Sequence, residues 1–193
     1  MVDRSNESVD EMMKHLNKAK QVDKAATRRA RRGKTGTKLQ DKIKRQTNAA
    51  VLASNHKARL KEIAANDAVT HRSGKRWKSA KVGFEAHGRL PIYYRLDGDV
   101  THKGYISNIV LEPEENTDKA EELLQHITDE DTYSEYFDKL DTTTFVVTDG
   151  KALDNPFPQT ELEKLSGDGT IEEGYSRQPA YVIQRPNDFP DFP

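Results

Sequence analysis

The sequence predicts an α+β protein built on a small mixed β-barrel with short peripheral helices, preceded by a basic N-terminal extension that is helical or disordered. The order of the candidate elements predicts the class, and the distribution of charge predicts the basic extension. Candidate strands and helices follow one another irregularly, without the strand–helix alternation of a doubly wound sheet. The charge is also split, because residues 1–91 carry 23 basic and 9 acidic side chains and the rest carry 8 and 23, although the net charge is −1.

We expect three parts: a basic N-terminal helix or arm over residues 1–48, a domain over residues 49–185 and a proline-rich tail over residues 186–193. A hydrophobic fraction of 34% beside 33% charged residues predicts that some of the chain lies outside the core. No run approaches the roughly 18 apolar residues of a membrane span, and no signal-peptide run opens the chain. With no cysteine as well, the sequence predicts a cytoplasmic protein without membrane contact, disulfides or thiolate metal sites.

The extension begins with a candidate helix over residues 8–30. Ser8 and Glu11 have the spacing of a capping box, and apolar side chains then recur at steps of three and four residues. So thin an apolar stripe fits three roles: light packing on the domain, docking to a protein partner, or a helix that stays solvated until it binds.

From Thr27 the extension becomes a cation-rich arm that Gly33 and Gly36 interrupt. The alternative to a binding role is a solvated charge run. We favour contact with nucleic-acid phosphates, which supplies affinity without sequence preference. The cations expected to make these contacts are Arg28, Arg29, Arg31, Arg32, Lys34, Lys38, Lys42, Lys44 and Arg45.

The first part of the domain is expected to contain a strand, a helix and a basic segment. AAVLAS at residues 49–54 has apolar side chains on both faces, as a central strand would, and helical spacing follows over residues 57–65. Residues 69–82 indicate a strand or loop that holds the single tryptophan, Trp77. This ring is either a core anchor or a stacking ring within a basic surface, to which we assign Lys75, Arg76 and Lys78 as further phosphate-binding residues.

The second part of the domain is expected to open with a β-hairpin. Residues 90–96 and 103–113 predict two strands joined at an Asp97-Gly98 turn, and alternation places Tyr93 and Tyr94 on opposite faces. The tail has too many prolines for a central strand, so we expect a sheet edge or a free end. The remaining elements are expected as helices at 116–127 and 129–140, a strand at 142–148, a loop at 149–158, a short helix at 160–165 and a strand at 179–185.

In their order and spacing, these segments resemble the EVE-type domain of the PUA-like superfamily, which also contains YTH and ASCH domains. AVLASNHKARLKEIAANDAVTHRSG is similar to the first strand and helix of those domains, with the polar pair Ser54-Asn55 directly after the strand. LPIYYRLDGDVTHKGYISNIVLEP is similar to their central hairpin, and TTFVVTDGKALDNPFPQTELEKL to a later strand, loop and short helix. The chain departs from the family at Gly83-Phe84-Glu85, which an insert-like AHGR follows, and it lacks the lysine signature of ASCH domains.

The resemblance implies a domain that turns one base of DNA or RNA, modified or unmodified, into an aromatic-lined pocket. A base can be recognised fully only after unstacking, and stacking on aromatic rings and hydrogen bonds to the base edge offset that cost. Ser54 and Asn55 match the polar positions of the family, and His71 and Trp77 fall where a pocket wall is expected. Tyr105, on the second hairpin strand, completes the expected base pocket.

Two other classes of function fit the sequence. A small nuclease or other nucleic-acid hydrolase is less favoured, because Asp149 with Glu161 to Lys164 lacks the acid-X-Lys spacing of restriction-type nucleases. An interaction protein would dock a partner through residues 8–30. No close histidine pair, phosphate loop or dinucleotide fingerprint occurs, so neither a metal nor a cofactor is expected.

Overall fold

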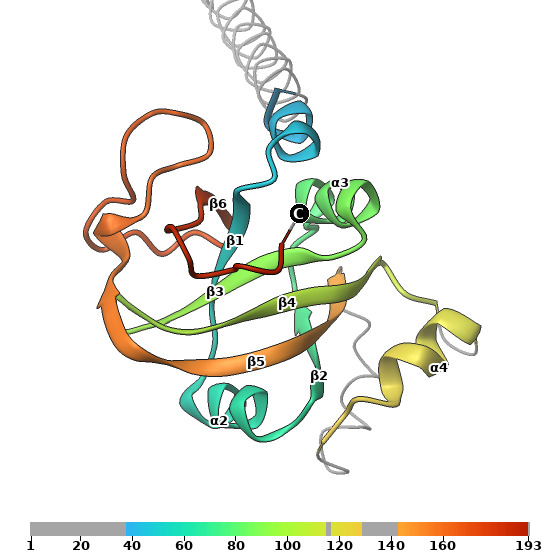
Figure 1. Cartoon of the computed structure of the whole chain (residues 1–193). Coiled ribbons are helices and arrows are strands. Elements are labelled where there is room, and N and C mark those ends of the chain that lie inside the picture. The colour runs from blue at the N-terminus through green and yellow to red at the C-terminus, as the bar shows by residue number, and fades with distance from the viewer. Residues whose placement is uncertain (1–37, 115–116, 129–142, 193) are drawn as a thin grey trace, which may run out of the picture. The chain divides into compact units, whose positions relative to one another are not determined.

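The computed structural model describes residues 38–114, 117–128 and 143–192, and its centre is one curved six-stranded sheet (Figure 1). The strand order is β2-β5-β4-β3-β1-β6, with β1 and β3 parallel and all other neighbours antiparallel. The class is therefore α+β with a mixed sheet, and its two edges are β2 and β6. The strands are β1 (Ala49–Ser54), β2 (Ala68–Ser73), β3 (Leu90–Leu96), β4 (Asp99–Leu111), β5 (Thr143–Pro158) and β6 (Ala180–Ile183).

Short helices accompany the sheet. Helix α2 (Lys57–Ala65) has the predicted bounds, and α4 (Asp118–Leu124) is shorter than predicted. Helix α3 (Lys78–His87) was not predicted, because its apolar residues recur at every second position, from Ala80 to Ala86, rather than at helical spacing. Its stop signal is Gly88, which adopts a left-handed φ of 75° and donates its N–H to the carbonyl of Phe84. The predicted helices over residues 8–30 and 129–140 lie outside the described residues.

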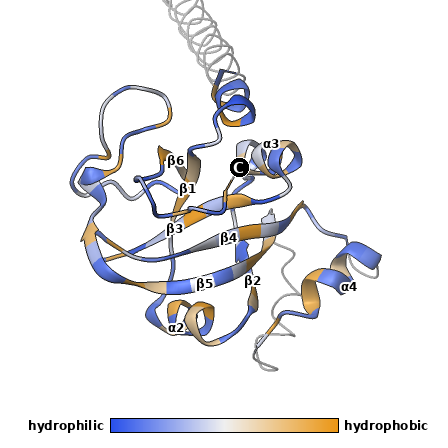
Figure 2. Cartoon of the chain, viewed as in Figure 1, coloured by the Kyte–Doolittle hydropathy of each residue, from blue (hydrophilic) through white to orange (hydrophobic). Residues whose placement is uncertain are grey.

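Both faces of the sheet are buried at the central strands β1 and β3. One face packs against α2, α3 and a helix over residues 38–45, and the other is covered by segments that follow β5. The apolar residues follow the central strands in Figure 2. Tyr93 and Tyr94 lie on opposite faces, as alternation predicted, and both are buried, at 0% and 1% exposure. Two-sided burial explains why β1 and β3 are apolar almost throughout.

Strand β5 is much longer than predicted, and the prediction of a loop over residues 149–158 is wrong. The turn formers of that segment lie in a continuous strand that pairs with β4 as far as Pro158 opposite Asp99. Asp149 has a positive φ of 52°, and three register shifts interrupt the pairing. Such bulges bend a strand without ending it, which lets β5 curve around the end of the sheet in Figure 1.

The segments after β5 also differ from expectation. The helix expected over residues 160–165 is a single 3-10 turn at Gln159–Glu161, after which Glu163 and Lys164 form isolated bridges with Thr170 and Val182. The tail forms no strand, yet Phe189 is only 6% exposed and packs on the second core cluster. The tail is therefore neither a sheet edge nor a free end.

The compact unit that contains the sheet begins at Leu39, ten residues before the expected start of the domain at Ala49. Ile43, within the segment assigned to the arm, is fully buried in the first core cluster, and Leu39 packs against that cluster. The basic character of residues 38–45 hid these two apolar positions, which are one helical turn apart.

The tightest packing predicts how two glycines respond to substitution. A Cβ on Gly150 would overlap the side chain of Ile63 and lie 2.6 Å from its carbonyl oxygen. Gly150→Ala should therefore lower the free energy of unfolding by about 1–3 kcal/mol, because backbone atoms of α2 must move.

Gly83→Ala is the matched control. Its Cβ would meet the ends of the Ile43 and Leu90 side chains at 3.0–3.2 Å, and alanine favours the helix by up to about 1 kcal/mol. Urea unfolding of both variants checks the prediction, and equal losses of stability would contradict it.

Candidate functional site

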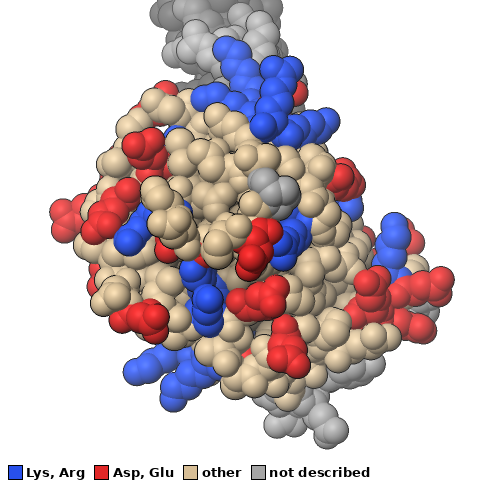
Figure 3. Space-filling view, in the orientation of Figure 1, with Lys and Arg blue, Asp and Glu red and all other residues tan. Residues whose placement is uncertain are grey.

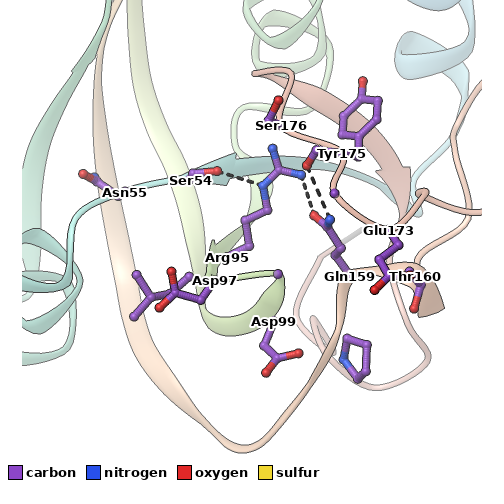
Figure 4. Close-up of a pocket in the computed structure, with 14 residues that line it drawn as sticks. Ser54, Asn55, Arg95, Asp97, Asp99, Gln159, Thr160, Glu173, Tyr175 and Ser176 are labelled. Atoms are coloured by element: carbon purple, nitrogen blue, oxygen red, sulfur yellow. Dashed lines mark hydrogen bonds between the residues drawn. The ribbon is translucent and has the colours of Figure 1, made fainter.

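A cleft with a volume of about 770 Å³ opens where β1 and β3 end (Figure 4). Its walls are the end of β1, the turn between β3 and β4, the start of the 3-10 turn and a loop over residues 173–176. Ser54 and Asn55, predicted as the polar residues of a base pocket, both line it. The structure therefore places the first two predicted site residues in a real cavity.

Arg95 forms the polar centre of this cleft and is only 4% exposed. Its Nε donates to Ser54 Oγ at 2.8 Å, and its two terminal nitrogens donate to Gln159 Oε1 at 2.5 Å and to the Arg177 carbonyl at 3.2 Å. These three bonds leave one N–H on each terminal nitrogen without a described partner, since a guanidinium has five N–H donors. No described carboxylate forms an ion pair with Arg95, and burial lowers the pKa of this guanidinium.

Gln159 and Tyr175 hold the guanidinium in place. Gln159 is 3% exposed, and its Nε2 donates to the carbonyls of Glu172 and Tyr175 at 3.3 and 3.4 Å, which turns Oε1 toward Arg95. The guanidinium carbon lies 5.5 Å from the centre of the Tyr175 ring, a cation–π distance. The cleft thus offers a fixed fork of donors beside a half-buried aromatic ring.

Carboxylates also line the cleft. Asp97, Asp99 and Glu173 are exposed members of its wall, whereas Arg95 is buried within it. Hydrogen-bond donors are therefore central and acceptors lie at the edge. A phosphate would meet three like charges there, whereas an uncharged ring with both donors and acceptors could be satisfied by both groups.

A buried polar chain leads from the cleft into the core. Asn55 Oδ1 accepts from the His56 N–H at 2.9 Å, which turns Nδ2 toward His71 Nδ1 at 3.3 Å, and Tyr94 OH lies 2.7 Å from the same nitrogen. His71 Nδ1 is therefore an acceptor, and the proton of the neutral ring lies on Nε2. That atom is buried and has no hydrogen-bond partner among the residues that the structure describes. Burial, aided by Arg59, lowers the pKa of His71 from 6.5 to about 3.

The other predicted pocket residues lie elsewhere. His71 stands behind Asn55 and does not line the cleft. Trp77 is 1% exposed, stacks on Phe145 at 4.6 Å and donates from Nε1 to Ser73, so it is the core anchor rather than a stacking ring on the surface. Tyr105 is 7% exposed and lies beneath the tail, beside a different cavity.

Sequence reasoning missed Arg95, Gln159 and Tyr175. A signal existed for Arg95 alone, because it is the one charged residue in the apolar run LPIYYRL. A cation inside a buried strand is rare unless it has a partner, so its position marks a site. Gln159 reaches the site because β5 continues to Pro158, and Tyr175 lies on a later loop whose position local patterns do not predict.

The predicted phosphate-binding cations divide into three groups. Arg28, Arg29, Arg31, Arg32 and Lys34 lie outside the described residues. Lys42 instead donates to the carbonyls of Leu165 and Ser166. The others are exposed, and Arg76 pairs with Glu112 at 2.7 Å: Lys38, Lys44, Arg45, Lys75, Arg76 and Lys78.

Within the described ranges, no three His, Asp or Glu side chains converge as a metal site would require. The described helices also include none that is both long and apolar enough to cross a membrane.

The buried imidazole predicts a specific acid sensitivity. Because the pKa of His71 is lower in the folded state than in the unfolded state, the unfolded chain binds the extra proton between roughly pH 6 and pH 3. This group therefore lowers the free energy of unfolding as the pH falls, by up to about 1.4 kcal/mol per pH unit.

His71→Gln should flatten that acid slope, whereas His56→Gln, at an exposed position, should retain it. Urea unfolding followed across this pH range measures both slopes. An unchanged slope in His71→Gln would show that another group controls acid unfolding.

Comparisons with protein-family models, curated proteins and solved structures find no match to this chain. The resemblance to EVE-type domains therefore stays a prediction.

Proposed function

We propose that the protein is a nucleic-acid-binding module whose cleft receives one unstacked base of DNA or RNA, while the basic arm contacts the phosphate backbone. The observation that carries the proposal is the buried guanidinium of Arg95, which faces the cleft without an ion pair to any described carboxylate. A buried cation costs free energy unless it has compensating partners. A ligand that offers acceptors to this fork would supply them.

A base edge suits the chemistry of the cleft better than a phosphate does. The two remaining N–H groups of Arg95 can donate to a carbonyl oxygen and a ring nitrogen, the pairing by which arginine binds guanine. Carboxylates such as Glu173 can accept from the N–H groups of the same ring, and Tyr175 offers an aromatic face. The three carboxylates would repel the phosphate, so the backbone is expected outside the cleft.

The phosphate backbone of the nucleic acid can lie along the helix of residues 38–45. Figure 3 shows Lys and Arg side chains gathered over this helix, and Lys44 and Arg45 are exposed there. Lys42 binds the loop carbonyls of Leu165 and Ser166, so the basic helix adjoins the segment that leads toward the cleft. The cations of residues 28–34 precede this helix in the chain and would supply further phosphate contacts.

The nuclease alternative has less support. Asp97, Asp99 and Glu173 share the cleft, but in the described part of the chain no carboxylate trio is placed to hold a metal ion. Asp149, Glu161 and Lys164 do not line the cleft. The alternative of an interaction protein depends on residues 8–30, which are not described.

Substitution of Arg95 tests the role of the cleft. Arg95→Lys keeps the charge but loses the fork, so it should reduce the preference for one base over others by roughly tenfold or more, the worth of a good bidentate contact. Arg177→Lys is the matched control, because the Arg177 side chain is exposed and only its carbonyl binds Arg95. Competition binding of modified and unmodified oligonucleotides at physiological salt measures the preference.

The folded state of Arg95→Lys is checked by its thermal unfolding midpoint, since Arg95 also anchors the loop at Arg177. A folded variant that retains the base preference would remove Arg95 from recognition.

The arm makes a separate prediction. Replacement of Arg28, Arg29, Arg31 and Arg32 by Gln should weaken binding to all sequences alike and lower the slope of log affinity against log salt. The slope should fall by about 0.9 for each duplex phosphate that the variant no longer neutralises, or by about 0.7 on single strands. An unchanged salt slope would exclude these arginines from the interface, whatever the outcome at Arg95.

A further inference from the structure

The tail has a chemistry that the proposed cleft does not use. It repeats Asp-Phe-Pro twice, at residues 188–190 and 191–193, so an anion and an aromatic ring alternate along a segment that the structure describes as turns and bends up to residue 191. Phe189 is buried against the second core cluster, and Phe192 packs at its margin. The surface beneath these residues places cations beside the carboxylate and aromatic side chains beside the phenyl rings.

The carboxylate of Asp188 lies in a cationic pocket. Tyr93 OH donates to its Oδ2 at 2.5 Å, and the Lys103 ammonium lies 3.9 Å from Oδ1. Arg185 Nε lies 3.9 Å from Oδ2. Lys103 is 9% exposed and also donates to the Asp188 carbonyl, so a buried cation has this one tail residue as its described ion-pair partner.

The phenyl rings of the tail lie on aromatic side chains of β3 and β4. The Phe189 ring is 5.0 Å from that of Tyr93 and 5.3 Å from that of Tyr105, both edge to face, and Lys103 Nζ lies 5.3 Å from its centre. The Arg89 guanidinium lies 4.4 Å from the centre of the Tyr105 ring and donates to the Asp191 carbonyl. The surface therefore receives a ring and an anion side by side.

Few backbone bonds hold the tail. Its described backbone hydrogen bonds are local, from Asp188 N to the Arg185 carbonyl and from Phe192 N to the Phe189 carbonyl. Cavities of about 250 and 380 Å³ flank it, and Lys103, Lys151 and Asp188 line both. Lys151 is exposed there and forms no ion pair among the described residues. The tail therefore fills neither of the two cavities and forms no ion pair with Lys151 among the described residues.

We propose that the surface formed by Tyr93, Tyr105, Arg89, Lys103, Lys151 and Arg185 is a second site for single-stranded nucleic acid, which the tail occupies as an internal ligand. A nucleotide carries a phosphate and an aromatic base in one unit, as Asp188-Phe189 carries a carboxylate and a phenyl ring. Cationic grooves with aromatic platforms bind single strands in this way. Asp149 and Asp154 also line the two cavities, but the surface carries the four cations Arg89, Lys103, Lys151 and Arg185, so a strand with successive phosphates would also engage Lys151, which the tail does not.

This site is distinct from the cleft at Arg95, because the lining of the cleft and that of the two tail cavities have no residue in common. The inference also does not rest on base recognition. Variants at Arg95 test the cleft, and variants in the tail test this surface, so either proposal can fail alone.

Asp188→Asn in the full chain tests the site, with a single-stranded thymidine oligonucleotide as the probe. Loss of the carboxylate loosens the tail, so a larger fraction of the protein has the site open and the affinity should rise roughly tenfold. Asp154→Asn is the matched control, because Asp154 lines the same smaller cavity but lies outside the tail. It removes an equal charge, and its gain should stay below about twofold.

An equal gain in both variants would mean that charge alone acts, and no gain in Asp188→Asn would exclude the site; either result overturns the proposal. Adding Lys103→Gln to Asp188→Asn should abolish the gain. Stronger binding of a PNDFPDFP peptide than of the oligonucleotide to Asp188→Asn would assign the surface to a peptide instead.

Displacement of the tail has its own readout in the wild-type protein. Saturation with the same oligonucleotide should speed hydrogen exchange at the amides of Asp188 and Phe192, since their local hydrogen bonds belong to the docked tail. The same acceleration should occur in Arg95→Lys. Slowed or unchanged exchange at both amides would show that the strand binds elsewhere.

Discussion

Strands with apolar side chains on both faces are stable only when both faces are covered, and this constraint organises the whole domain. Val51 and Ile92 point into one cluster, whereas Leu52 and Tyr93 point into the other. Covering the first face requires three helices, including the one that carries Ile43. The second is covered by the segments after β5, where Leu162 and Ile171 lie in the same cluster as Phe189 of the tail. The basic beginning and the proline-rich end of the described chain therefore pack on opposite faces of the sheet.

The same constraint explains what could be predicted. Local patterns identified β1, α2 and the hairpin, because two-sided apolar runs, helical spacing and an Asp-Gly turn depend only on nearby residues. They failed for β5, where the neighbouring β4 keeps turn formers such as Asp149 in a strand. They also failed for Trp77, because nothing local tells a buried ring from an exposed one. Ser54 and Asn55 lie in the cleft as expected, but Gln159 joins them through long-range pairing.

Burial gives the polar residues of the domain their character. Arg95 and His71 both lie on strands from which water is excluded. Burial of a charged group costs free energy, and the two side chains respond to this cost differently. Arg95 keeps its charge and is held by neutral acceptors, whereas His71 is neutral, because burial lowers its pKa far below the ordinary value. Asn55 joins the two regions, since it lines the cleft and donates to His71. A movement of Asn55 at the cleft would therefore change the hydrogen bonding of His71 inside the core.

The ammonium of Lys42 connects two surfaces that are far apart in the sequence. It binds the carbonyls of Leu165 and Ser166, 123 and 124 residues further along the chain. The segment that follows Ser166 continues to Tyr175 at the cleft. A phosphate that bound Lys42 would have to replace these two hydrogen bonds, so contact with a polyanion at Lys42 competes with the anchoring of the loop at Leu165 and Ser166. By reciprocity, a ligand that strengthened this anchoring would weaken phosphate contact at Lys42 by the same factor.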